Sequence, residues 1–388
     1  RAGGLGIIET SSGETENCQR EIRTMVASGL PFGVNLPIRF LKDDAMLRFV
    51  CESGIRFVTT SAGSPAKFIA PLKAAGIVVY HAVPTLDTAL KCVDAGVDGL
   101  VVEGGEGGGF KNPEEVSTLV LLQAIRERVD VPLIAAGGIV DGRGMAAAFA
   151  LGAEAVQMGT RFVASAESPV HAHYKGAIVQ ASTTGTWMLN TQSSPCIRAL
   201  KTPFTETIHA AGVMGPETFN GIQGVYFGGD MNAAPALAGQ SAGLIHEVKT
   251  VQTIIEETVT QFQAIAQRMG QIMVLGGGQQ CLDRDTDLNR LKPLDHVLRK
   301  EVGCLGLFDQ VLVKGHLALH VGKETQGLRH AFKAIYVPRT VKRANPKGFW
   351  PVVAAFLPQW QRKSSIRCRL SAESGNPKPL KSWILHYF

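Results

Sequence analysis

The stretch Pro132-Leu-Ile-Ala-Ala-Gly-Gly138, followed by Ala155-Val-Gln-Met-Gly-Thr160, decides the fold. In both segments a short apolar run ends in glycine, and a helix-like segment lies between the two runs. Glycine at the end of a strand lets backbone N–H groups approach a ligand without an intervening side chain. Neighbouring strands that end in this way build the phosphate site of a (β/α)8 barrel, usually after strands seven and eight. The pattern therefore predicts a bound phosphorylated cofactor.

Seven β-like runs recur along the first part of the chain, and helix-like stretches separate them. The runs are 4–9, 32–36, 55–60, 77–82, 99–103, 131–136 and 155–159. Regular alternation of apolar strands with helices is typical of a parallel sheet that is covered on both faces. A doubly wound open sheet is the alternative, but no G-x-G-x-x-G follows the first run. We predict an α/β fold, a TIM barrel that lacks its first strand in this sequence.

Composition fits one large core for most of the chain. The 388 residues are 45% hydrophobic, and the seven cysteines show no C-x-x-C spacing. Scattered cysteines of this kind favour reduced thiols and a cytoplasmic protein over a disulfide framework or a zinc site. No apolar run has the length of a membrane span and no signal peptide is visible, so we expect no membrane partner.

Charge divides the chain into two unlike parts. Residues 1–278 carry 20 Lys and Arg against 25 Asp and Glu, whereas residues 279–388 carry 19 against 8. A basic tail can indicate nucleic-acid binding. This one contains no recognisable nucleic-acid motif, so we expect an extension outside the fold and no nucleic-acid partner.

The glycine turns and several further motifs carry a family resemblance. The motifs are Ala2-Gly-Gly-Leu-Gly6, Gly33-Val-Asn-Leu36, Glu103-Gly-Gly-Glu-Gly-Gly-Gly109, Val131-Pro-Leu-Ile-Ala-Ala-Gly-Gly-Ile139, Leu151-Gly-Ala-Glu-Ala-Val-Gln-Met-Gly-Thr-Arg-Phe162, Ala166-Glu-Ser-Pro169 and Gly239-Gln-Ser-Ala-Gly-Leu-Ile245. In this order they resemble the nitronate monooxygenase (2-nitropropane dioxygenase) family, which includes the FMN-dependent enoyl-ACP reductases of type II. The resemblance covers roughly residues 1–270.

The resemblance implies four segments. Residues 1–168 would form the FMN-binding barrel from strand two to strand eight, and residues 169–238 a small helical lid inserted after strand eight. Residues 239–272 would return as the last barrel helix, and residues 273–388 would be the basic tail, which matches nothing in the family.

Residue patterns and resemblance agree on where FMN would bind. Backbone N–H groups at Gly137, Gly138, Gly159 and Thr160 would hold its phosphate, with the Thr160 hydroxyl as a further donor. Asn35 ends a strand and would meet the flavin or the substrate, because polar residues at the C-terminal ends of barrel strands are typical of function. The complete set of predicted cofactor contacts is Asn35, Ser61, Gly63, Glu103, Gly108, Ala136, Gly137, Gly138, Gln157, Gly159 and Thr160.

The catalytic base is not identified. Many family members have a histidine where this chain has Phe110, and phenylalanine cannot take a proton. Glu103 and His81 are weak candidates for an acid–base role. Glu103 and Glu106 flank the glycine-rich loop, and beside an acid–base role we expect such carboxylates to hold the loop by accepting backbone N–H bonds. Lys111 is a candidate anion partner, but we expect it to be a solvated loop lysine. The pair His171 and His173 does not have the spacing of a helical metal site, so we expect no metal.

Three functions remain open. In the first, an alkyl nitronate reduces FMN, and O2 reoxidises it, yielding a carbonyl compound and nitrite. In the second, NAD(P)H reduces FMN, which then reduces an enoyl thioester or a quinone. The third is a chain that binds no flavin, because the absent first strand and its loop would normally cover part of the ring. The expected partner is a small-molecule substrate, with a second copy of the chain as a homodimer.

Overall fold

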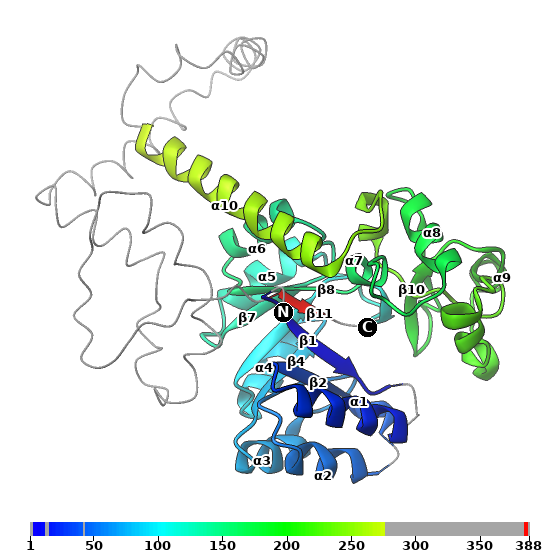
Figure 1. The fold of residues 1–388 in the computed structure, drawn as a ribbon, viewed down its shortest axis with the longest axis horizontal. Helices are drawn as coiled ribbons and strands as arrows, with labels where there is room; N and C mark the ends of the chain where they lie inside the picture. Colours follow the sequence, from blue (N-terminus) through cyan, green and yellow to red (C-terminus); the bar gives the residue numbers. More distant parts are fainter. Residues whose placement is uncertain (1–2, 12–14, 42, 276–383, 387–388) are drawn as a thin grey trace, which may run out of the picture. The chain divides into compact units, whose positions relative to one another are not determined.

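We describe a computed structural model of residues 3–11, 15–41, 43–275 and 384–386 (Figure 1). The chain divides into two compact units, Arg1–Ile265 with Pro351–Phe388, and Ala266–Trp350. Of the second unit the described residues are 266–275, the last turns of one helix. The predicted basic tail, residues 273–388, therefore lies outside the described residues except for 273–275 and 384–386.

All seven predicted barrel strands are present, and adjacent ones pair in parallel. They are β1 (Leu5–Glu9), β2 (Phe32–Pro37), β3 (Phe57–Ser61), β4 (Val78–Val83), β5 (Gly99–Glu103), β7 (Leu133–Ala136) and β8 (Ala155–Met158). A short strand, β11 (Ile384–His386), pairs in parallel with both β1 and β8, and the strands form a closed barrel. The predicted TIM barrel is confirmed, and three residues of the predicted tail occupy its eighth place, which the sequence did not lead us to expect.

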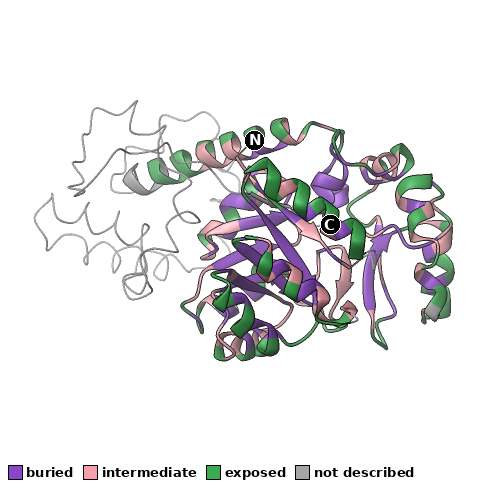
Figure 2. Cartoon of the chain, turned by 60° about the horizontal axis from the view of Figure 1, so that its bottom comes forward, coloured by how far each residue is buried: buried purple, intermediate pink, exposed green. Residues whose placement is uncertain are grey.

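Helices follow the strands and cover the barrel. They are α1 (Thr15–Ser28), α2 (Ala45–Glu52), α3 (Ala66–Ala74), α4 (Leu86–Asp94), α5 (Thr118–Arg126), α6 (Gly142–Ala150) and α10 (Val251–Leu275). Side chains alternate along each strand. One set, including Phe57, Tyr80 and Ile134, packs together inside the barrel, and the other packs beneath the helices. The strands are accordingly buried, whereas most helices expose one face (Figure 2).

The segment predicted as a helical lid is helical only in part. After α7 (Thr160–Val163) it contains α8 (Ala172–Gln180), α9 (Pro203–Ala211) and the single-turn elements η2 (Pro216–Phe219) and η3 (Gly224–Gly228). It also contains β9 (Thr186–Leu189) and β10 (Cys196–Leu200), which form an antiparallel sheet with β6 (Gly109–Lys111). We call this three-stranded sheet the lid sheet. Because β6 comes from the loop after β5, the lid is built partly from the barrel's own connection.

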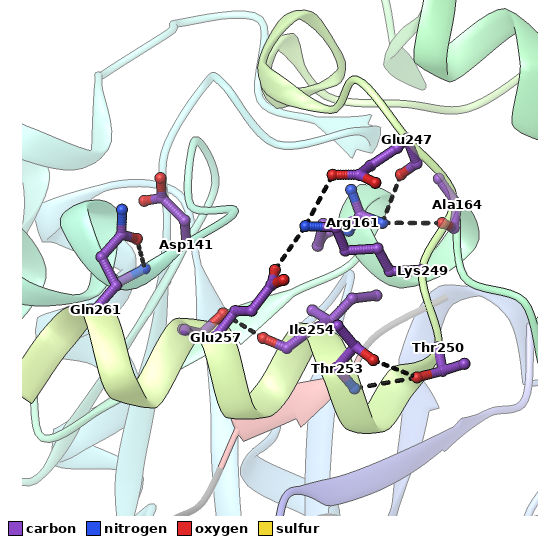
Figure 3. Close-up of polar contacts among 12 residues, drawn as sticks. Asp141, Arg161, Ala164, Glu247, Lys249, Thr250, Thr253, Ile254, Glu257 and Gln261 are labelled. Carbon is purple, nitrogen blue, oxygen red and sulfur yellow. Dashed lines mark hydrogen bonds and ion pairs between the residues drawn. The ribbon is translucent and has the colours of Figure 1, made fainter.

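The return to the barrel begins with η4 (Gln240–Leu244), and α10 follows. The Glu167 carboxylate accepts a bond from the Val251 N–H at 2.9 Å, which satisfies a donor at the first turn of α10. Gln261 accepts from the Gly142 N–H at 2.8 Å and ties α10 to the start of α6 (Figure 3). In the described part of the chain we find no helix that is both long and apolar enough to cross a membrane.

Candidate cofactor site

Two glycine corners lie side by side where β7 and β8 end. Ala136 pairs with Gln157 across these strands, so Gly137–Gly138 and Gly159–Thr160 follow on neighbouring strands that are about 4.8 Å apart. The three glycines are half-buried and therefore reachable from solvent. We call Gly137, Gly138, Gly159 and Thr160 the phosphate cradle. The structure brings these predicted residues together.

The first corner requires glycine for conformational reasons. Gly137 and Gly138 have φ angles of 93° and 74°, in the left-handed region that side chains disfavour. Gly159 has a φ of −100°, so its backbone imposes no such requirement. Two consecutive left-handed residues turn the chain sharply at the end of β7.

A loop of five glycines and Glu106, residues 104–109, packs directly on this corner. We call it the glycine loop. A Cβ atom at Gly137 would lie 3.1 Å from the Gly107 nitrogen and 3.2 Å from the Gly104 oxygen. The backbones are therefore in contact, and no side chain fits between them. The glycine loop therefore lies against the first corner, at Gly137.

Thr160 is buried and its hydroxyl already has one partner. The Gly239 N–H donates to Thr160 Oγ1 at 2.9 Å, and the neighbouring Gln240 N–H donates to the Glu106 carbonyl at 2.9 Å. A hydroxyl that accepts one bond keeps its own proton for another acceptor. Thr160 can therefore still donate to a phosphate oxygen.

Gln157 carries a buried acceptor without a partner. Its Oε1 atom has no hydrogen bond within the described residues, and the residue is 7% exposed. Val156 and Met158, on either side, pack beneath the helices, so Gln157 faces the barrel interior. An unsatisfied buried acceptor is costly, and a ligand N–H at the barrel mouth would satisfy it. Amide donors at the corners and this acceptor fit a phosphate ester with a polar ring, as FMN has.

The predicted contacts at the ends of β2 and β3 form a buried polar network. Asn35 Nδ2 donates to Glu9 Oε2 at 2.9 Å and to Ser61 Oγ at 3.2 Å. Asn35 Oδ1 accepts from the Thr59 hydroxyl at 2.9 Å. The structure thus brings Asn35 and Ser61 together and shows their polar atoms bonded to protein partners. Their contact with a flavin remains a prediction.

Gly63 lies beyond this network, near the single turn η1 (Ile38–Phe40). A Cβ atom at Gly63 would lie 3.0 Å from the Ile38 side chain. Gly63 therefore permits close packing of η1, and its contact with a cofactor remains a prediction.

His81 is not brought to the cradle. Tyr80 and Ala82 belong to the cluster inside the barrel, so His81 points to the opposite face of β4, towards the helices. Its Nδ1 lies 2.7 Å from the Thr60 hydroxyl, and burial lowers the pKa of His81 to about 4. This placement favours a structural histidine over an acid–base group.

Carboxylates of the β5 loop have separate partners. Glu103 pairs with Lys111, whose side chain is 4% exposed, so the expectation of a solvated lysine is wrong. Glu106 accepts from the Thr118 N–H at 2.9 Å and from its hydroxyl at 3.0 Å. The predicted acceptance of backbone N–H bonds is therefore seen for Glu106, whereas Glu103 binds the Lys111 ammonium.

Phe110 lies on β6 among aromatic rings. Its ring centroid is 4.8 Å from that of Phe40 and 5.6 Å from that of Phe219. Phe40 follows β2, and Phe219 belongs to the lid. An apolar cluster thus occupies the position of the family histidine.

The two lid histidines bind each other and the backbone. His171 Nδ1 accepts from the His173 N–H at 3.1 Å, and His173 Nδ1 lies 3.0 Å from the Gly229 oxygen. Within the described residues no group of three or more His, Cys, Asp and Glu side chains is arranged to hold a metal.

Two buried arginines, Arg161 and Arg198, were not predicted from the sequence. Arg161 follows the cradle, but its Nη2 donates to the carbonyls of Ala164 and Glu247 at 3.1 and 2.9 Å (Figure 3). Burial lowers the pKa of Arg161. Arg198 interrupts the apolar run Cys196-Ile-Arg-Ala-Leu200, and a lone charge in such a run is a signal of a buried, paired side chain.

The closed ring of parallel strands and the covering helices define a (β/α)8 barrel, with two glycine corners at the ends of β7 and β8. Residues 41–261 match the family model of nitronate monooxygenase. The chain belongs to the nitronate monooxygenase family.

The curated proteins that this chain is similar to are named for different activities. A 5-hydroxy-7a-methyl-1-oxo-octahydro-1H-indene-4-carboxyl-CoA dehydrogenase of Rhodococcus jostii is 41% identical over 172 residues, covering 44% of this chain and 48% of the relative. A nitronate monooxygenase of Pseudomonas aeruginosa is 32% identical over 252 residues, covering 58% and 72%. The matches thus span 48% and 59% of the first two curated relatives, both CoA dehydrogenases.

Solved structures agree on the fold. FabK from Thermotoga maritima is 40% identical with a TM-score of 0.66, covering 69% of this chain and 88% of that one. A nitroalkane oxidase from Streptomyces ansochromogenes has a TM-score of 0.63 at 24% identity, covering 69% and 91%. The dehydrogenase and the monooxygenase are oxidoreductases by name. FabK and the nitroalkane oxidase share the fold of this chain.

Proposed function

We propose that this chain is an FMN-dependent oxidoreductase that uses O2 to oxidise alkyl nitronates to a carbonyl compound and nitrite. The observation that carries the proposal is the adjacency of the two glycine corners at the end of β7 and β8. Family membership and the nitronate monooxygenase relative from Pseudomonas aeruginosa support it.

The cradle residues would hold the FMN phosphate through backbone amides and the Thr160 hydroxyl. Gln157 would offer its unpartnered Oε1 to the ring system. Glu103 and Ala136, which are paired at the ends of β5 and β7, and Gly108 of the glycine loop would line the ring. When bound, FMN would supply the acceptor for substrate electrons and the donor for O2.

Phe110 bears on the choice of substrate. Its apolar neighbours Phe40 and Phe219 provide no proton acceptor at this position. A neutral nitroalkane must lose a proton before oxidation, whereas a nitronate is already the anion. The chain therefore suits a nitronate better than a neutral nitroalkane, and its residues need mainly to position the substrate and exclude water.

A second candidate is an NAD(P)H-dependent reductase acting on an enoyl thioester or a quinone. The observation that favours it is the similarity to a CoA dehydrogenase and to FabK, at 41% and 40% identity. The same cradle would serve both functions.

Anaerobic mixing of the flavin-loaded protein separates these functions. One sample receives NADPH, a second ethylnitronate, and each is followed by the loss of flavin absorbance. We expect bleaching by ethylnitronate alone. Bleaching by NADPH alone would contradict the proposal and favour the reductase.

A further inference from the structure

Arg198 connects the lid sheet to the glycine loop. It lies on β10 and is 3% exposed. Its Nε donates to the Gly105 carbonyl at 2.8 Å, and its Nη2 donates to Glu115 Oε1 at 2.6 Å. Its Nη1 donates to the Thr186 hydroxyl on β9 at 3.2 Å. One planar guanidinium thus joins the lid, the loop and the segment that leads to α5.

The glycine loop depends on such ties for its order. Five of its six residues are glycine, and glycine loses more backbone entropy on folding than any other residue. Near its start, the Gly105 N–H donates to the Val116 carbonyl at 2.8 Å. In its middle, the Glu106 carboxylate is bound to Thr118. Arg198 adds a side-chain tie from β10, 93 residues away, beside the bond from the Gln240 N–H to the Glu106 carbonyl.

We propose that Arg198 is a positioning residue for cofactor binding. Its guanidinium holds the Gly105 carbonyl and so keeps the glycine loop against Gly137 of the cradle. It acts through the loop backbone and not by touching the cofactor. The inference rests on the proposed function, because it assumes that the cradle binds FMN. It makes cofactor affinity dependent on a residue of the lid.

Replacement of Arg198 leaves no fully buried charge behind. Glu115 keeps 41% of its side chain exposed, so water can solvate its carboxylate once the arginine is gone. Removing a partner is most damaging when the remaining charge is completely buried. Arg198→Met, which retains the length of the stem, is therefore suited to the test.

The test uses the full chain as wild type, Arg198→Met and Arg198→Lys. A matched control is Arg39→Met, because Arg39 also reaches the lid, donating to Ser194 Oγ at 2.8 Å, but has no bond to the loop. The FMN dissociation constant is measured by flavin fluorescence. Amide hydrogen exchange is followed at Gly105 and Gly107 in flavin-free protein, since both N–H groups are hydrogen-bonded.

We expect Arg198→Met to raise the FMN dissociation constant about tenfold or more, because a bond from a charged donor is lost. Exchange at Gly105 and Gly107 should accelerate, while amides of β4 and β7 keep their wild-type rates. For Arg198→Lys we expect an FMN dissociation constant and loop exchange rates between those of wild type and Arg198→Met, because an ammonium lacks the planar fork that bridges several acceptors. Arg39→Met should match wild type in both measurements.

Unchanged affinity and unchanged loop exchange in Arg198→Met would overturn the inference. So would faster exchange spread evenly over all barrel strands, which indicates general destabilisation. If wild type binds no FMN, the proposed function fails and so does the role of Arg198 in cofactor binding. In that case exchange at Gly105 would still show whether Arg198 orders the loop.

Discussion

Gly138 shows how one residue serves the cradle. Its φ of 74° is left-handed, and a Cβ there would lie 3.6 to 3.9 Å from the Glu106 side chain. A single methyl group would touch Glu106 without overlap, but the branches of a larger side chain would press on it. Because Glu106 also holds Thr118, a substitution at Gly138 reaches both the corner and the loop.

We predict that Gly138→Val abolishes FMN retention. Backbone strain and displacement of Glu106 should deform the corner that offers its amides. Gly76→Val is a matched control, because Gly76 has a φ of 75° with open space around it, before β4. Both variants should lose about 1–2 kcal/mol of unfolding free energy. FMN content after gel filtration should fall only in Gly138→Val, and stoichiometric FMN there would refute the cradle.

Phe110 supports a second prediction, on turnover. Phe110→His should raise kcat/KM for nitroethane more than for ethylnitronate, since only the neutral substrate needs a proton acceptor. Phe110→Leu, which is apolar, controls for the change of shape among the rings. Oxygen uptake with each substrate provides the measurement. Equal changes for both substrates would show that a base is not what the site lacks.

Some residues of the site follow from local sequence and others do not. The cradle was predictable because glycine at a strand end is a local signal. The burial of Lys111 and its pairing with Glu103 were not predictable, because they depend on the pairing of β6 with β10 in the lid sheet. For His81, the strand was predictable, but which face it takes depends on the register of the barrel.

At the scale of elements, the position of α10 is fixed by the close approach of its backbone to that of α6. Lys249, just before α10, binds Glu247 at 2.9 Å and Glu257 at 2.7 Å (Figure 3). Such partly exposed ion pairs contribute little to stability. The tighter constraint lies at Gly142, where a Cβ would come within 2.3 Å of the Phe262 nitrogen. The backbones of α6 and α10 therefore touch.

Gly142→Ala should lower the free energy of unfolding by about 1–3 kcal/mol, because overpacking forces α10 away from α6. The control is Gly176→Ala in α8, where an added Cβ has nothing within 4 Å. That change should be neutral or stabilising by about 1 kcal/mol, as alanine favours helix. Urea unfolding measures both. Equal stability of the two variants would contradict the described packing.

The lid sheet was not predicted from the sequence, because its pairing joins segments that are far apart in the chain. β6 has three residues and contains a glycine, which is too short and irregular for a strand signal. It pairs with β10 across more than 80 residues of sequence, as in the register of Phe110 with Ile197. Pairing over such a separation is a tertiary event that local periodicity does not report.

At the scale of the whole molecule, the barrel was predictable because its strands recur regularly. Seven apolar runs with helices between them leave few other topologies. The eighth place was not predictable in this way. Leu385 of β11 pairs with both Leu5 and Gln157, far from either in sequence.

The stability of the whole fold should depend on His81 in acid. Burial lowers its pKa from 6.5 to about 4, so the folded state favours the neutral ring. As the pH falls, His81 is protonated in the unfolded chain before it is protonated in the folded one. The contribution of His81 to the free energy of unfolding is therefore present above pH 6.5 and is lost as the pH falls towards 4. Between pH 7 and pH 5 this amounts to about 2 kcal/mol.

His81→Gln should remove that part of the pH dependence. Urea unfolding at pH 7 and pH 5 gives the loss for each protein, and the difference between them isolates His81. His246→Asn, an exposed histidine, should behave as wild type. An identical loss in wild type and His81→Gln would show that His81 is not held neutral by the fold.

Flavin content tests the central claim most directly. The purified full chain is incubated with FMN, freed of excess by gel filtration and denatured, and the released flavin is quantified against protein. The adjacent corners at the ends of β7 and β8 predict one FMN per chain. A colourless protein that takes up no added FMN would contradict the account.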